Sequence, residues 1–214
     1  MKILVGQPKQ EAGIQQLKDD IEKQEDVEIV LYPEGYLSDE KQLRQACLLA
    51  KEKSIILITS YRKEQKDRAV VIDDKGTIIL ERPKTPAEDC ECLYSPMSAK
   101  CKRITIGYLL CMEVLKGMRD FKTDTLVDFI AHPIGVGMFS DLQFSQWVGE
   151  AQKIAKANHT MMIGTSHADG SYRNCGISLP ISYCVDETGK IIYISKSDTR
   201  TRIIDLKTKK VNII

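Results

Sequence analysis

The sequence predicts an α/β protein built from two mixed β-sheets covered by helices. Apolar strand patterns alternate with amphipathic helix patterns through most of the chain. Hairpin signals around Asp73-Asp74-Lys75-Gly76 and Glu187-Thr188-Gly189 require antiparallel pairs in addition to the parallel ones. The chain shows no composition shift typical of a linker, so we expect a single domain over residues 1–214.

The N-terminal part of the chain has a β-α-β-α-β pattern. Its strands are short apolar runs rich in β-branched residues, and its helices have apolar residues three or four positions apart. The second strand ends at Pro33 and Gly35, which stop a strand and start a loop. The predicted elements are strand 2–6, helix 14–21, strand 27–32, helix 39–53 and strand 54–59.

The rest of the chain adds two hairpins and further strand-helix units. The segment from Arg82 to Lys102 has three prolines and little periodicity, so we predict a long loop, which in a compact protein is typically functional or mobile. The predicted elements are hairpin 69–81, strand 104–110, a helix from Glu113, strand 126–131 ending at His132-Pro133, helix 141–157, strand 160–164, hairpin 181–195 and strand 202–206.

The composition argues against nucleic acid and membranes as partners. Lys and Arg total 31 and Asp and Glu total 30, so the formal net charge of +1 creates no broad field for phosphate groups. The N-terminus lacks the apolar region of a signal peptide, and no segment approaches the roughly 20 apolar residues that span a bilayer. We therefore expect a cytoplasmic protein.

The seven cysteines are an odd number in a chain without an export signal, so we expect reduced thiols. Cys90, Cys92 and Cys101 together with a histidine suggest a zinc site. The Cys-x-Cys spacing is unusual for zinc, however, and no fourth ligand is near in the sequence. We therefore predict no metal.

Three residues suited to amide chemistry each follow a predicted strand: Glu34, Lys84 and Cys111. Residues just past strand ends collect in clefts. A carboxylate can take the proton of a thiol, and an ammonium group or a backbone N–H, such as that of Met112, can stabilise the resulting oxyanion, each donor contributing about 2.7–4 kcal/mol. Taken alone, the three also fit a buried structural thiol, a capping or surface carboxylate and a solvated lysine.

Three segments that contain these residues resemble the signature blocks of the nitrilase superfamily, the carbon-nitrogen hydrolases. They are LYPEGYL (31–37), ERPKTP (81–86) and IGYLLCMEV (106–114), in the order of that family. Later parts of the family are similar to DFIAHPIG (128–135), QWVGEAQKIAKANHTMMIGTS (146–166) and NCGISLPISYCVDETGKII (174–192), so the resemblance covers most of the chain.

The resemblance implies a four-layer α-β-β-α sandwich, assembled as a dimer or larger homo-oligomer, that hydrolyses amides or nitriles without a cofactor. It implies that Glu34 is the general base, Lys84 stabilises the intermediate and Cys111 is the nucleophile. Many members have a second glutamate between the lysine and the cysteine. Glu91, upstream of Pro96, is the better match for it, and Glu88 is the alternative.

The departures from the family leave the substrate open. The chain is short, the segment from Lys84 to Cys111 is compact, and the proline often found soon after the cysteine is absent from residues 114–117. We expect a small amide, nitrile or carbamoyl compound as substrate. The alternatives are acyl transfer to an amine and a non-catalytic binding or assembly protein with the same fold. His132 and His167 at strand ends are candidates for lining the cleft, although hydrogen-bonded or exposed histidines are commoner at such positions.

Overall fold

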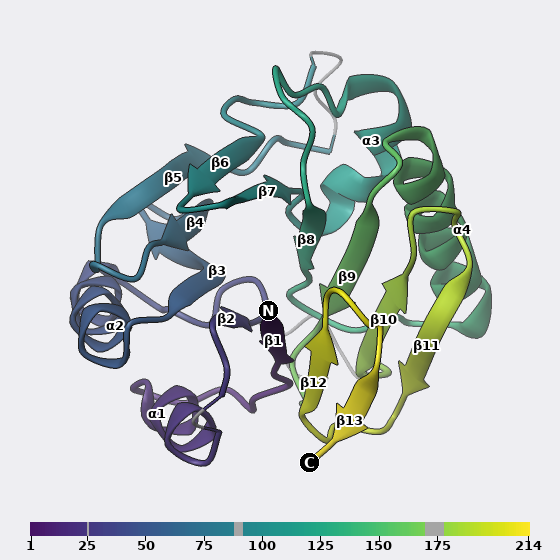
Figure 1. The fold of residues 1–214 in the computed structure, drawn as a ribbon. Coiled ribbons are helices and arrows are strands. Elements are labelled where there is room, and N and C mark those ends of the chain that lie inside the picture. The colour runs from purple at the N-terminus through teal and green to yellow at the C-terminus, as the bar shows by residue number, and fades with distance from the viewer. Residues whose placement is uncertain (25, 88–91, 170–177) are drawn as a thin grey trace.

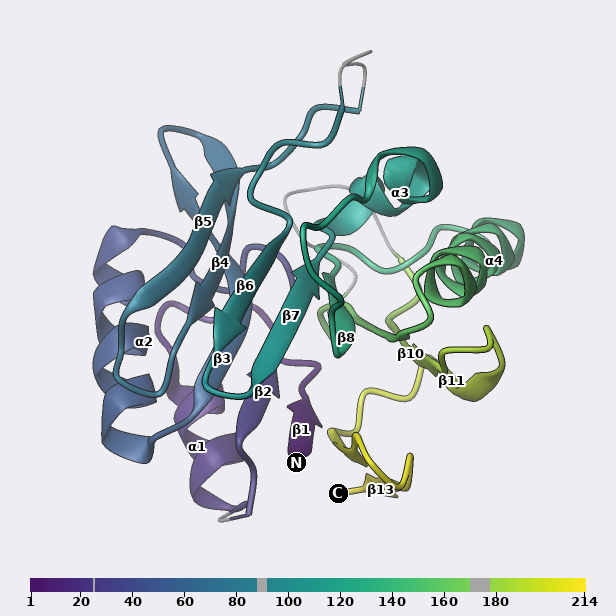
Figure 2. The same ribbon diagram turned by 45° about the horizontal axis from the view of Figure 1, so that its top comes forward.

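The computed structural model describes residues 1–24, 26–87, 92–169 and 178–214. A seven-stranded sheet packs face to face against a six-stranded sheet, and helices cover the outer face of each sheet (Figures 1 and 2). The predicted four-layer α-β-β-α sandwich of two mixed sheets is therefore confirmed. No helix in the described ranges is both long enough and apolar enough to cross a membrane.

The seven-stranded sheet has the order β13-β12-β1-β2-β3-β4-β5. Its three central strands β1, β2 and β3 are parallel, and every other neighbouring pair is antiparallel. Its strands are β1 (Lys2–Val5), β2 (Ile29–Leu31), β3 (Ile56–Lys63), β4 (Lys66–Ile72), β5 (Ile78–Pro83), β12 (Arg202–Asp205) and β13 (Val211–Ile213).

The six-stranded sheet has the order β11-β10-β9-β8-β7-β6. Its parallel core is β7, β8 and β9, with antiparallel strands on both sides. Its strands are β6 (Ser98–Cys101), β7 (Ile104–Tyr108), β8 (Phe129–Pro133), β9 (Met161–Thr165), β10 (Ile181–Val185) and β11 (Ile191–Lys196).

Two pairs of helices form the outer layers. In Figure 1, α1 (Gln15–Glu22) and α2 (Glu40–Lys53) cover the seven-stranded sheet on the left, and α3 (Val114–Asp120) and α4 (Asp141–Ala157) cover the other sheet on the right. A short helical turn, η1 (Cys111–Glu113), leads into α3. The side chains of Asp39 and Ser140 cap α2 and α4 by accepting a backbone N–H.

Three apolar cores hold the four layers together. The central core lies between the sheets and includes Leu31, Ile58, Ile106 and Phe129. The two outer cores pack each sheet against its own helices. Strands buried on both faces read as continuous apolar runs, which is why the parallel strands were the clearest features of the sequence.

The structure corrects the predicted long loop between Arg82 and Lys102. Residues 98–101 form β6, which pairs with β7. Their sequence, Ser-Ala-Lys-Cys, alternates polar and apolar residues over only four positions and contains no β-branched or aromatic residue. The pairing therefore depends on the strand beside it more than on local preference.

Three other predictions of element boundaries were wrong. The strand predicted to end at residue 59 runs on to Lys63 and turns into β4 through Glu64 and Gln65, both at positive φ, a two-residue hairpin without the usual glycine. His132-Pro133 does not stop β8 but forms its last two residues. The final strand β13 was not predicted.

Candidate active site

The fold brings Glu34 and Lys84 to the same edge of the seven-stranded sheet. Glu34 lies three residues past β2, and Lys84 directly follows β5. β5 is antiparallel to β4, which is antiparallel to β3, so β5 runs in the same direction as β2 and their ends coincide. Cys111 comes from the other sheet, at the first position of η1 after β7.

The three side chains line one cavity of about 350 Å³. Nζ of Lys84 donates a hydrogen bond of 2.7 Å to Oε1 of Glu34. The Glu34 side chain is 3% exposed and that of Lys84 is 25% exposed, so this ion pair faces the cavity mainly through the lysine. The remaining wall is largely apolar and includes Met112, Leu115, Val136, Met138, Phe139 and Trp147.

Burial governs the protonation of the two acids. Burial raises the pKa of Cys111 to about 12, and the Glu34 charge adds to this, while Lys84 and a hydrogen bond from the backbone of Gly135 oppose it. Burial also raises the pKa of Glu34, and the Lys84 ammonium counteracts this increase. The resting thiol is therefore protonated at neutral pH, and the Glu34 carboxylate is a stronger base than an exposed one.

Lys84 stays protonated in this setting. Burial alone would lower the pKa of Lys84. The negative charges of the Cys111 thiolate and of the Glu34 carboxylate together raise this pKa by more, so it lies above its ordinary value. A fixed ammonium group beside a thiol is the arrangement that stabilises negative charge on a reacting oxygen.

The backbone at Cys111 is strained, and a buried histidine hydrogen-bonds to its carbonyl oxygen. Its φ is 53°, in the left-handed region that residues other than glycine rarely adopt. Nε2 of the fully buried His132 lies 2.8 Å from the Cys111 carbonyl oxygen, and Nδ1 lies 2.5 Å from the Tyr183 hydroxyl. Because a carbonyl only accepts, Nε2 carries the proton and Nδ1 accepts from Tyr183.

Solved structures share this architecture. A carbon-nitrogen hydrolase from Helicobacter pylori G27 matches with a TM-score of 0.75 at 15% identity, over 98% of this chain and 90% of that chain. The chain has the fold of the nitrilase superfamily. No model of a known protein family and no curated protein sequence matches the chain.

Two other solved structures with the nitrilase fold show the same degree of likeness. An amidase from Nesterenkonia sp. AN1 matches with a TM-score of 0.72 at 14% identity, over 96% of this chain and 92% of that chain. A CN-hydrolase superfamily protein from Xanthomonas campestris, with an arsenic adduct in its active site, has a TM-score of 0.74 at 12% identity, over 95% and 89%. At these identities the likeness establishes the fold.

Not all of the predicted site residues lie in the described part of the chain. Met112 follows Cys111 in η1, where the first N–H groups of a helical turn point away from the helix. Glu91 and Glu88, the candidates for a second glutamate, both lie outside the described residues. Sequence reasoning missed Asp67, which lines the cavity and whose backbone oxygen accepts the N–H of Lys84 at 2.8 Å.

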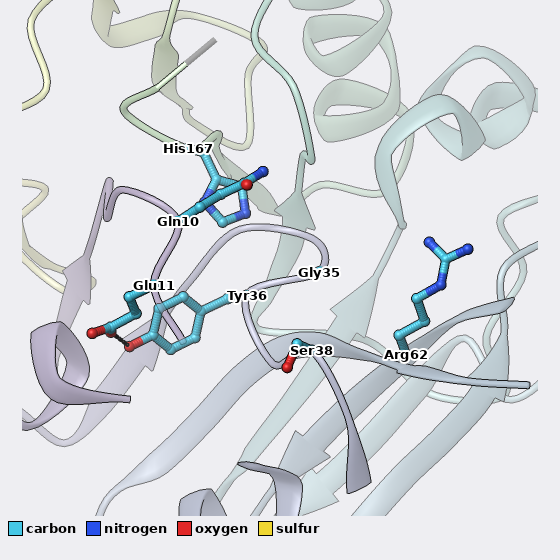
Figure 3. A pocket seen from close by; sticks show the side chains of 7 residues that line it. All are labelled: Gln10, Glu11, Gly35, Tyr36, Ser38, Arg62 and His167. Atoms are coloured by element: carbon cyan, nitrogen blue, oxygen red, sulfur yellow. Dashed lines mark hydrogen bonds between the residues drawn. The ribbon is translucent and has the colours of Figure 1, made fainter. Parts of the chain in front are cut away.

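His167 lines a cavity, but it is not the histidine that contacts the Cys111 backbone. A second cavity of about 190 Å³ lies beyond the Glu34-Gly35 turn, between His167 and Arg62 (Figure 3). Nε2 of His167 lies 3.0 Å from the Glu34 carbonyl oxygen, so this histidine supports the turn that carries the carboxylate. His132 instead lies buried behind Cys111.

The cysteines considered for zinc are only partly described. Cys90 lies outside the described residues, Cys92 is exposed and Cys101 is buried. Within the described ranges, no three His, Cys, Asp or Glu residues are grouped so that they could hold a metal ion. Both described cysteines are free thiols.

Proposed function

We propose that this chain is a carbon-nitrogen hydrolase that cleaves a small amide through a covalent thioester on Cys111, without a cofactor. The observation that carries the proposal is that Glu34, Lys84 and Cys111, from three separate segments, line one cavity, with Glu34 and Lys84 paired at 2.7 Å. A thiol can act as the nucleophile of acyl transfer from an amide, a carboxylate as its base and an ammonium group as the donor that stabilises the oxyanion.

Attack begins from the neutral thiol. As Sγ of Cys111 bonds to the carbonyl carbon, the thiol proton passes to the Glu34 carboxylate, whose raised pKa suits it to the role of general base. The carbonyl oxygen becomes an oxyanion. Lys84 and the backbone N–H of Met112 stabilise that charge.

The two remaining steps return the site to its starting state. Glu34 gives its proton to the amide nitrogen, the carbon–nitrogen bond breaks, and the amine leaves a thioester on Cys111. Water then attacks the thioester, Glu34 accepts the water proton, and the acid leaves as the thiol is restored. A nitrile substrate would form a thioimidate at the same sulfur. A second glutamate, Glu91 or alternatively Glu88, would assist proton transfer to the amine.

The cavity wall suggests the kind of acyl group. Leu115, Met138, Phe139 and Trp147 line the same cavity as the polar triad. A volume of about 350 Å³ is near the lower end of ligand pockets and fits a small molecule. A short, uncharged acyl group would place its apolar part on this wall and its amide at Cys111.

The test combines ammonia release with mass spectrometry. Purified protein is incubated with a panel of small amides, nitriles and carbamoyl compounds, and Cys111→Ser and Cys47→Ser are assayed in parallel. We expect turnover and a covalent adduct on Cys111 in the wild type and in Cys47→Ser, and neither in Cys111→Ser. Absence of turnover, with slow and uniform labelling of the thiols by iodoacetamide, would instead support a non-catalytic binding or assembly protein.

The homo-oligomeric state and the cytoplasmic location expected from the sequence remain predictions. Sedimentation velocity at several protein concentrations measures the first directly. A monomer that retains full turnover would show that self-association is not needed for the proposed reaction.

A further inference from the structure

Arg82 and Glu113 form an ion pair in the protein interior. Both side chains are 1% exposed, and the contact is bidentate, with Nη1–Oε1 at 2.7 Å and Nη2–Oε2 at 2.6 Å. Removing two charges from water is costly, and buried pairs often add little net stability over apolar residues of similar size. The significance of this pair therefore lies in what it holds.

The Glu113 carboxylate binds the backbone beside both reactive side chains. Oε1 accepts the N–H of Thr85 at 2.8 Å, directly after Lys84. Oε2 accepts the N–H of Leu110 at 2.7 Å, directly before Cys111. One carboxylate thus connects the segment that carries the ammonium group to the segment that carries the thiol.

The Arg82 guanidinium keeps that carboxylate in place. Its Nε donates to the Pro96 carbonyl oxygen at 3.1 Å, and Nη1 donates to the Pro83 carbonyl oxygen at 3.1 Å. It also lies 6.0 Å from the centre of the Tyr108 ring. The planar guanidinium has N–H donors that point in several directions and can bind both carboxylate oxygens at once. A lysine ammonium cannot reproduce this geometry, which explains why position 82 is an arginine.

We propose that Arg82 and Glu113 are positioning residues that set the distance between Nζ of Lys84 and Sγ of Cys111. Neither side chain is among the residues that line the reaction cavity, so neither would touch a substrate. The proposal rests on the proposed function. A misplacement of about 1 Å can cost about 100-fold in rate. A small shift of the Arg82–Glu113 ion pair, here called the clamp, should therefore affect turnover more than binding.

Conservative substitutions test the clamp by keeping its charge and changing its reach. For Glu113→Asp and Arg82→Lys we expect kcat to fall about 10- to 100-fold and KM to change less than about threefold. The matched control is Glu81→Asp on the same strand, whose ion pair with Arg68 at 2.7 Å is partly exposed. That control should retain kcat and KM within about twofold.

A second readout needs no substrate. The ammonium of Lys84 lowers the pKa of the Cys111 thiol, so a displaced Lys84 should slow alkylation of Cys111 by iodoacetamide at a fixed pH and move its pH profile upward. Glu113→Asp should show this change and Glu81→Asp should not. An unchanged alkylation profile together with unchanged kcat in both clamp variants would overturn the proposal.

The experiments distinguish a failure of this inference from a failure of the proposed function. If the wild type turns over no substrate and forms no adduct, the proposed function fails, and the alkylation profile alone decides whether the clamp positions the lysine. If the single variants do not fold, the double variant Arg82→Met/Glu113→Gln takes their place, because it leaves no unpaired buried charge. It should fold and show the same loss of kcat, and wild-type kcat in it would overturn the proposal.

Discussion

Nζ of Lys84 lies 2.7 Å from Oε1 of Glu34, although 50 positions separate the two residues in the chain. The pair places a fixed positive charge and a basic carboxylate in the cavity that Cys111 lines. Each partner affects the pKa of the other and of the Cys111 thiol. Glu34 raises the thiol pKa and Lys84 lowers it, so substitutions at the two positions should shift that pKa in opposite directions, while both should lower the rate.

Glu34→Gln should remove the proton acceptor while keeping the shape of the side chain. We expect kcat to fall about 100- to 10,000-fold, the range typical of a lost general base. In the wild type, kcat/KM should rise with pH through the raised pKa of Glu34, because only the ionised carboxylate accepts the proton. Steady-state rates from pH 4 to 9 measure both effects. Activity within tenfold of wild type in Glu34→Gln would rule out this role.

Lys84→Met should remove the positive charge that stabilises the Glu34 carboxylate and the negative charge that develops on the substrate carbonyl oxygen. We expect kcat to fall about 100-fold or more, and alkylation of Cys111 to slow at fixed pH, because Lys84 lowers the pKa of the thiol. Lys66→Met is the control, since Lys66 is exposed and lines only the neighbouring cavity. A comparable loss in that control would indicate a general charge effect and not a specific role of Lys84.

His132 should make stability depend on pH. Burial lowers the pKa of His132 from 6.5 to about 4, so the unfolded chain binds a proton below about pH 6.5 whereas the folded protein does so only near pH 4. Stability from this group is therefore fully present above pH 6.5 and is lost as the pH falls to 4, by up to about 3 kcal/mol. Urea unfolding at pH 7.5 and 4.5 measures the difference.

The control for His132 is His159→Asn. His159 is exposed, and its positive φ is one that asparagine tolerates. This variant should keep the full loss of stability between pH 7.5 and 4.5. His132→Asn should be less stable at pH 7.5, because its hydrogen bonds to Cys111 and Tyr183 change, yet should lose less on acidification. An equal loss in wild type and His132→Asn would show that other groups cause it.

Gly164→Ala should disturb the hydrogen bonds that link Tyr183, His132 and the Cys111 carbonyl oxygen. A Cβ at this position would lie 2.4 Å from Cε1 of Tyr183, whose hydroxyl contacts His132. We expect about 1–3 kcal/mol of destabilisation and a displaced ring. Gly149→Ala is the matched control. It meets no atom within 4 Å and lies in α4, so it should stabilise the helix by about 0.5–1 kcal/mol. Thermal unfolding of both variants tests the contrast.

Local sequence patterns predicted most of the elements and the residues at their ends. Buried parallel strands appear as continuous apolar runs. Glu34 and Cys111 lie three residues past two such strands, β2 and β7, and Lys84 directly follows the antiparallel strand β5, so all three stand near strand ends, where a cleft forms. The same patterns failed at β6, whose pairing depends on a neighbouring strand, and at the Glu64-Gln65 turn, which lacks the residues that usually mark one.

The sequence by itself determined the order of strands and helices and the three reactive groups that follow strands, because burial and chain reversal depend on adjacent residues. Only the tertiary structure decided which side chains meet. The contact of Lys84 with Glu34, the clamp of Arg82 on Glu113 and the support of Cys111 by His132 depend on strand order, strand direction and sheet packing. Those relations join residues tens of positions apart, and no local pattern encodes them.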